Sequence, residues 1–186
     1  SNASRTALMA IGSGGWDDGL TELFGVPRAI LPEITDCAGQ LGKTSPDMFG
    51  TSIPITGMAG DQQAATIGQG CFAIGQTKAT FGTGAFVLTQ TGTTLRQSQH
   101  RLLSTVLYQI AGERHYALEG SVFVAGSLVQ WLRDDLGLIG SAAETEPLAR
   151  SVPDNGGVYL VPALSGLGAP HWQPNARGTI AGLSFS

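Results

Sequence analysis

The sequence has few charged residues, and its basic residues nowhere form a run. Lysine, arginine, aspartate and glutamate make up 13% of the 186 residues, and the formal net charge is −4. Nucleic acids and anionic membrane surfaces are bound by clustered basic residues, so we expect neither as a partner. Apolar runs are also too short for the roughly 18 residues of a membrane-spanning helix, so we expect no membrane insertion.

Cysteine and histidine are also scarce. Cys37 and Cys71 stand in unrelated contexts, and the three histidines are scattered without the spacing of metal ligands. Disulfide-stapled domains are rich in cysteine, and zinc sites need several ligands at characteristic spacings. We therefore predict reduced, buried thiols rather than a disulfide or a metal pair, and no metal bound by the protein's own residues. No signal peptide is visible, and we expect a cytoplasmic protein.

Glycine, by contrast, is abundant, with 27 residues where ordinary usage of about 7% would give half as many. The glycines stand in short motifs between apolar runs. This placement indicates backbone that turns sharply or comes close to a ligand.

The order of apolar and turn-forming segments predicts an α/β fold in which hairpin-linked strands are followed by a helix on a sheet. We predict helices over residues 16–24, 61–68, 124–136 and 141–151, and strands over 52–56, 76–81, 85–90, 102–110, 114–118 and 158–162. The last strand is expected to be buried. A shift in composition near residues 66–76 predicts a boundary between two domains.

The predicted helix over residues 124–136 has two different faces. Its apolar face, expected to be core, carries Leu128, Trp131, Leu132 and Leu136. Gly126, Gln130 and Arg133 fall on the opposite face, where a glycine and an amide in register are available to a ligand.

The segment Gly57-Met58-Ala59-Gly60-Asp61-Gln62-Gln63 places a carboxylate between a predicted strand and a predicted helix. Open α/β sheets bind ligands at this position. Asp61 could act there as a base on a substrate hydroxyl, and Gln62 could hydrogen-bond a neighbouring hydroxyl. An aspartate at a helix start is more often only a cap, and from position alone we favour the cap.

Two further glycine motifs are weaker signals. The hairpin turn Gly82-Thr83-Gly84 could offer a hydroxyl and backbone N–H groups to a phosphate, or could be an ordinary turn. Gly126 could let backbone approach a nucleotide, although by itself it favours close packing of a helix on a strand. The loop over residues 165–172 indicates a lid or an interface.

Together and in this order, the motifs resemble the FGGY carbohydrate kinases, and among them the members that act on glycerol. The segments that carry the resemblance are Ser4-Arg5-Thr6, Trp16-Asp17-Asp18, Leu31-Pro32-Glu33, Ile53-Pro54-Ile55, Ala59 to Ala65, Gly82-Thr83-Gly84, Tyr116 to Gly120, Gln130 to Asp134 and Gly166 to Pro170. Each alone is weak, whereas the ordered set covers almost the whole chain.

The resemblance implies an actin-like ATPase fold with two ribonuclease H-like domains, here in part. Residues 1–66 would be the C-terminal part of the substrate domain, and residues 67–186 the N-terminal part of the nucleotide domain. It implies ATP-dependent phosphorylation of glycerol to glycerol 3-phosphate, with magnesium neutralising charge. A homo-oligomer is expected for the full-length protein.

The same resemblance assigns a role to each site residue. Asp61 would be the catalytic base and would also bind glycerol, together with Gln62. Phe86 would line the pocket against the carbon chain, and Thr83 would bind the nucleotide phosphates. Gly126 and Gln130 would lie further along the nucleotide site.

Several motifs of the family lie outside residues 1–186, among them the N-terminal phosphate hairpin and the Asp-Gly-Gly nucleotide motif. We therefore expect an internal fragment that is inactive alone, because each site would be built from both sides of a cleft. Two alternatives remain open. One is a kinase of the same family that acts on xylulose, gluconate or ribulose. The other is a non-catalytic actin-like binding module, which would not need Asp61, Thr83 and Gln130 together.

Overall fold

A computed structural model describes residues 1–185, which form two compact units. Unit 1 comprises Ser1–Lys78 and Leu88–Glu119, and unit 2 comprises Ala79–Val87 and Gly120–Ser186. Helices and strands occur in both units, so the predicted α/β class is confirmed. The boundary between the units falls inside three strands of one sheet, so each of these strands has residues in both units.

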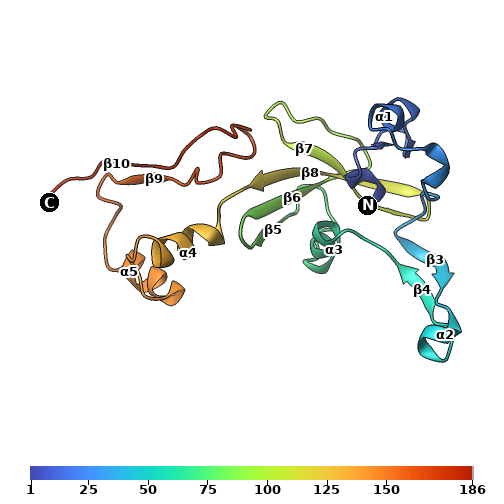
Figure 1. Ribbon diagram of the computed structural model, residues 1–186, viewed down its shortest axis with the longest axis horizontal. Coiled ribbons are helices and arrows are strands. Elements are labelled where there is room, and N and C mark those ends of the chain that lie inside the picture. The colour runs from blue at the N-terminus through green and yellow to red at the C-terminus, as the bar shows by residue number, and fades with distance from the viewer. Residues whose placement is uncertain (186) are drawn as a thin grey trace. The chain divides into compact units, whose positions relative to one another are not determined.

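Unit 1 begins with short elements joined by turns. Its elements up to the sheet are η1 (Ala3–Arg5), β1 (Met9–Ala10), β2 (Gly15–Trp16), α1 (Asp18–Leu23), η2 (Arg28–Ile30), β3 (Ala38–Lys43), α2 (Pro46–Phe49), β4 (Pro54–Gly57) and α3 (Asp61–Gly68). β1 pairs with β2 and β3 with β4, both antiparallel, and the second pair carries α2 at its far end (Figure 1). The predicted first helix is confirmed, with Asp17 as its cap: the carboxylate accepts the Leu20 N–H at 2.9 Å.

The sheet has four strands in the order β5-β6-β8-β7. Their bounds are β5 (Thr77–Phe81), β6 (Ala85–Gly92), β7 (Leu103–Ile110) and β8 (Glu113–Val122), close to the predicted strands. β7 and β8 form an antiparallel hairpin. Its turn holds Ala111 and Gly112 at φ of 51° and 76°, the pair of positive values that suits the twist of a two-residue hairpin loop.

The core of unit 1 lies on the two faces of the β7–β8 hairpin, because neighbouring side chains of a strand point to opposite faces. On one face Val106 and Tyr116 pack with Met9 of β1, which is also covered by Trp16 and Leu95. On the other face Leu88, Leu107 and Ala117 form a second buried cluster.

Unit 2 contains α4 (Gly126–Asp134), η3 (Ala142–Glu144), α5 (Thr145–Arg150), β9 (Tyr159–Val161) and β10 (Thr179–Ala181). α4, η3 with α5, and β9 occur close to where the sequence predicts them, whereas β10 is not among the predicted strands. Less is buried than expected. The prediction that residues 158–162 form a buried strand is wrong: Tyr159 is 66% exposed. β9 pairs only with β10 within the described chain, and this two-stranded ribbon leaves the side chains uncovered.

The two faces of α4 are distributed as predicted, although the apolar face is not core. Leu128, Trp131 and Leu132 are half-buried, and Leu136, beyond the helix end, is exposed. The opposite face, with Gly126, Gln130 and Arg133, is exposed. α4 therefore contributes no fully buried residue.

Both cysteines are buried and free, which confirms the prediction of buried thiols. No helix in residues 1–185 combines the length and the apolar character needed to cross a membrane.

Candidate active site

Asp61 is the first residue of α3, which follows β4 after residues 58–60. Gly60 stands in the cap position with φ −66° and ψ 151°, and no side chain caps the helix. The cap interpretation of Asp61 is therefore wrong, because the aspartate lies one position inside the helix. Its carboxylate is exposed and accepts a weak hydrogen bond from Gln62 Nε2 at 3.3 Å. A ligand can reach it.

Gln62, the next residue of α3, is half-buried and is held by Lys78 of β5. The Lys78 ammonium group donates a short hydrogen bond to Gln62 Oε1. Since an ammonium group only donates, it requires the carbonyl oxygen of the amide on its side. The NH₂ group of Gln62 then lies toward Asp61.

Lys78 is 3% exposed, which is unusual for a lysine. Burial lowers the pKa of Lys78 below its ordinary value of 10.5, while the negative charges of Glu119 and Asp61 oppose the shift. Glu119 is fully buried in β8. Both of its oxygens accept from the Arg5 guanidinium, at 2.7 and 3.0 Å. Positive and negative groups therefore alternate from Arg5 to Asp61 within unit 1.

Sequence reasoning did not identify Lys78, Arg5 or Glu119 as site residues. Arg5 and Glu119 stand in two of the motifs of the resemblance, but nothing in the sequence pairs them. Lys78 offers a clearer signal, because it is a lone lysine inside a predicted strand, four residues before Gly82. A lysine that interrupts such a strand must be either exposed or paired.

In unit 2, the turn Gly82-Thr83-Gly84 caps α4. The N–H groups of Ala125 and Ser127 donate to the Thr83 carbonyl at 2.9 and 3.2 Å, and the Gly126 N–H donates to the Gly82 carbonyl at 2.8 Å. The Ser127 hydroxyl also donates to the Thr83 carbonyl, at 2.9 Å. The first amides of α4 are thus occupied by the turn.

Two glycines make this close approach possible. A Cβ on Gly126 would lie 2.5 Å from the Gly82 carbonyl oxygen, and a Cβ on Gly84 would lie 2.3 Å from that of Val122. Backbone atoms cannot give way as a flexible side chain can. Close packing therefore accounts for Gly126, and the Thr83 side chain remains exposed on the turn.

The two other predicted residues of unit 2 lie near this turn in the chain. Gln130 is one helical turn after Gly126 on α4, and its side chain is exposed. Phe86 follows the turn in β6 and is 37% exposed, beside buried Ala85. The structure thus brings together Asp61 and Gln62 in unit 1. Thr83 and Gly126 come together in unit 2, through backbone bonds.

The loop after β9 packs on the end of β8 in unit 2. The Ala169 N–H donates to the Ser121 carbonyl at 2.9 Å, and a Cβ on Gly168 would meet that oxygen at 2.1 Å. The Trp172 ring meets Phe123 edge to face at 6.2 Å. This loop is tied down, which favours neither a lid nor an interface.

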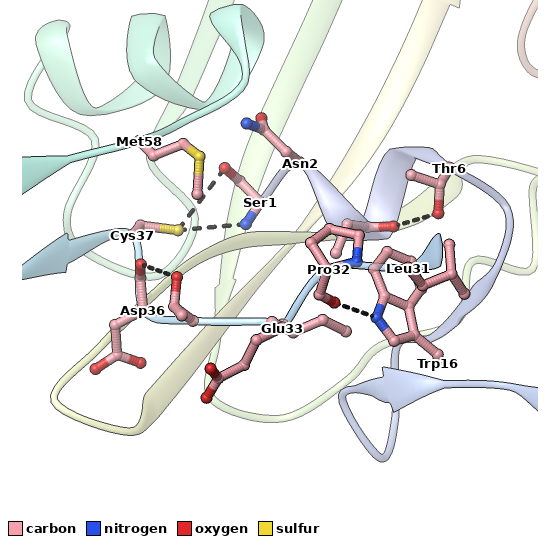
Figure 2. Close-up of a pocket in the computed structure, with 13 residues that line it drawn as sticks. Ser1, Asn2, Thr6, Trp16, Leu31, Pro32, Glu33, Asp36, Cys37 and Met58 are labelled. Carbon is pink, nitrogen blue, oxygen red and sulfur yellow. Dashed lines mark hydrogen bonds between the residues drawn. The ribbon is translucent and has the colours of Figure 1, made fainter. Parts of the chain in front are cut away.

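A cavity with a volume of about 280 Å³ lies in unit 1. Figure 2 shows its wall of Trp16, Leu31, Pro32 and Met58, with the Trp16 indole N–H donating to the Pro32 carbonyl at 2.8 Å. None of the six predicted site residues is among the described residues that line it.

Metal-ligating side chains do not cluster in residues 1–185: no group of three histidine, cysteine, aspartate or glutamate residues could hold an ion.

Comparison with known proteins gives consistent matches over the whole chain. Residues 1–68 match the N-terminal domain, and residues 77–186 the C-terminal domain, of the FGGY family of carbohydrate kinases. A glycerol kinase of Xanthobacter autotrophicus is 58% identical over 183 residues, which are 98% of this chain and 37% of that protein. The chain thus spans little more than a third of the length of this curated relative.

Two solved structures have a similar fold over nearly the whole chain. The crystal structure of Plasmodium falciparum glycerol kinase with ADP matches with a TM-score of 0.90 and 40% identity, covering 99% of this chain and 37% of that one. A xylulose kinase from Rhodospirillum rubrum matches with a TM-score of 0.77 and 26% identity, covering 95% and 36%.

Proposed function

Because this chain belongs to the FGGY family of carbohydrate kinases, we propose that it serves in the ATP-dependent phosphorylation of glycerol to glycerol 3-phosphate. The main support for this proposal is the 58% identity to a glycerol kinase over nearly the whole chain, compared with 26% identity to a xylulose kinase. The family membership predicted from the ordered motifs is confirmed. So is the actin-like ATPase fold with ribonuclease H-like domains, present in part.

Asp61 is the residue we assign to the chemical step. Its carboxylate is exposed at the start of α3 and is not used as a cap. In this role it accepts the proton of the glycerol hydroxyl as that oxygen attacks the γ-phosphorus of ATP. Gln62 binds a neighbouring hydroxyl, and Phe86, which keeps an exposed face on β6, covers the carbon chain.

Thr83 and Gln130 are the residues we assign to ATP. The Thr83 carbonyl is bonded to α4, so its exposed side chain is the part that can meet a phosphate oxygen. Gly126 contributes by lacking a side chain, since its N–H is already bonded to Gly82. Magnesium, bound through the ATP phosphates, supplies positive charge to the transferring group.

The remaining assignments concern the protein as a whole. We place the boundary between substrate and nucleotide domains at residues 66 and 67. We also propose that the full-length protein is a homo-oligomer. We assign it to the cytoplasm, because Cys37 and Cys71 are free thiols, as reducing compartments maintain.

The test uses the complete gene product that contains this chain. ADP release is measured with magnesium-ATP and, in turn, glycerol, xylulose, ribulose and gluconate. We expect the highest kcat/KM with glycerol by a factor of at least about 100, the size expected where buried polar groups must match the substrate hydroxyls. A higher kcat/KM with one of the sugars would reassign the substrate. ATP binding without transfer to any acceptor would favour the non-catalytic alternative.

A further inference from the structure

The buried ammonium group of Lys78 has no role in the assignments above, although it contacts a residue assigned to the substrate. We propose that Lys78 is a positioning residue, which holds the carbonyl oxygen of Gln62 and so turns the NH₂ group of Gln62 toward the acceptor hydroxyl. This inference rests on the proposed function, because it takes Asp61 and Gln62 as the acceptor site.

A glutamine can present either its oxygen or its NH₂ group to a substrate, and a free side chain exchanges the two by rotation. Lys78 removes this freedom, because its ammonium group can bond only the oxygen. The NH₂ group then lies toward Asp61, where the bond of 3.3 Å to Oδ2 leaves a second N–H for a ligand.

Lys78 is itself fixed in position. It is buried in β5, and the charge of Glu119 acts on it from β8. Glu119 is in turn bonded through both oxygens to Arg5. A buried ammonium group that is attracted by the charges of Glu119 and Asp61 has little freedom to leave, so the amide it holds is preorganised before a substrate arrives.

This arrangement dictates how two hydroxyls of the acceptor are recognised. The hydroxyl at Asp61 must donate its proton, because an ionised carboxylate only accepts. The hydroxyl at Gln62 must accept, because the amide offers it N–H alone. The pair Asp61 and Gln62 thus distinguishes the attacking hydroxyl from its neighbour by hydrogen-bond direction.

The first experiment measures Lys78→Met in the complete gene product, with the exposed Lys43→Met as the matched control. We expect kcat/KM for glycerol to fall about tenfold or more, which corresponds to losing one well-aligned polar contact. KM for ATP should stay within about twofold, and Lys43→Met should behave as the wild type. Unchanged kcat/KM in a folded Lys78→Met protein would overturn the proposal.

A double-mutant cycle separates positioning from general damage. Lys78→Met is combined with Gln62→Leu, which removes the amide that Lys78 is proposed to hold. We expect Lys78→Met to cost less than about threefold in the Gln62→Leu background, because two residues that act through one contact are not additive. An equal loss in both backgrounds would show that Lys78 does not act through Gln62.

Gln62→Glu keeps Lys78 and covers the case in which Lys78→Met fails to fold. Its carboxylate can pair with Lys78 but offers no N–H to a hydroxyl. We expect a protein at least as stable as the wild type, with kcat/KM for glycerol as low as that of Gln62→Leu. A destabilised Gln62→Glu, or one with normal kcat/KM, would contradict the assigned geometry.

Substrate analogues test the direction of the hydrogen bond between the Gln62 NH₂ group and the acceptor hydroxyl. Fluorine accepts weakly but cannot donate, so at the hydroxyl beside Gln62 a fluoro analogue should outperform the deoxy analogue. 2-Fluoro-1,3-propanediol is compared with 1,3-propanediol, and 3-fluoro-1,2-propanediol with 1,2-propanediol. We expect a preference for fluorine at one position in the wild type, lost in Lys78→Met. No preference at either position would contradict the proposal.

Failure of the proposed function is distinguishable from failure of this inference. If the wild type phosphorylates a sugar instead, the glycerol assignment falls, and the Lys78 and Gln62 variants are measured on that sugar. If no transfer occurs, the Gln62 NH₂ resonances, assigned by their absence in Gln62→Leu, decide the matter. They should move to the positions of a free glutamine in Lys78→Met, and unchanged resonances would overturn the proposal.

Discussion

The contact between Gly126 and the turn over residues 82–84 gives a prediction whose magnitude follows from the structure. A Cβ in Gly126→Ala would lie 2.5 Å from the Gly82 oxygen, and real Cβ contacts are essentially never shorter than 3.0 Å. The turn must therefore retreat by at least about 0.5 Å, because the Cβ is fixed rigidly to the helix backbone and the Gly82 oxygen is itself a backbone atom. The three backbone hydrogen bonds and the Ser127 hydroxyl bond that join the turn to the start of α4 would stretch with it.

Overpacking of this kind costs about 1–3 kcal/mol, and alanine recovers up to about 1 kcal/mol through its helix propensity. We expect a net destabilisation of about 1–2 kcal/mol in urea unfolding. Because Thr83 moves with the turn, KM for ATP should also rise, by about tenfold for a displacement of this size.

Gly68→Ala is the matched control, because Gly68 is also helical and its Cβ would meet open space. It should be neutral or slightly stabilising, with an unchanged KM for ATP. The reasoning is refuted if Gly126→Ala is as stable as Gly68→Ala and binds ATP normally.

Two further predictions concern the charged residues around Glu119. Arg5→Ala leaves the buried Glu119 carboxylate without its bidentate partner and should lower the free energy of unfolding by about 2 kcal/mol. The control, Arg150→Ala at the exposed pair with Glu146, should change it by less than about 0.5 kcal/mol. Equal effects of the two substitutions in urea unfolding would contradict the burial of Glu119. The second prediction follows from the lowered pKa of Lys78. Between the pKa of Lys78 in the folded protein and its ordinary value of 10.5, the unfolded chain binds more protons than the folded chain. The stability of the wild type relative to Lys78→Met should therefore increase as pH rises through this window. Urea unfolding of both proteins at roughly pH 8 and 10 measures the difference, and a constant or falling difference would show that Lys78 is not desolvated.

Much of the fold follows from local patterns. The helix over 61–68 and the hairpins around residues 82–84 and 111–113 occur where apolar periodicity and turn residues predict them, because local sequence determines both. The buried strand over 158–162 does not occur as predicted, because burial depends on what covers a strand. An apolar run cannot reveal that its only partner within residues 1–185 is β10.

The candidate site was predictable to a different extent for each residue. Asp61 is prominent in the sequence, but only the structure shows that Gly60, and not Asp61, holds the cap position. The sequence allows two interpretations of Gly126, approach of backbone to a nucleotide or close packing of the helix. The short distance to the Gly82 carbonyl supports close packing. Lys78 could not be assigned, because its burial depends on Glu119 and Arg5, which are distant in the sequence and meet only in the folded unit.

In the proposed reaction, Asp61 takes the proton from glycerol as ATP transfers its γ-phosphoryl group. The most direct measurement compares the wild-type gene product, Asp61→Asn and Asp47→Asn, the last an exposed aspartate in the first turn of α2. Glycerol 3-phosphate formation and thermal unfolding are recorded for each. We predict that Asp61→Asn folds normally and loses at least about 1,000-fold in kcat, while Asp47→Asn retains wild-type turnover. Near-normal formation of glycerol 3-phosphate by Asp61→Asn would contradict the account.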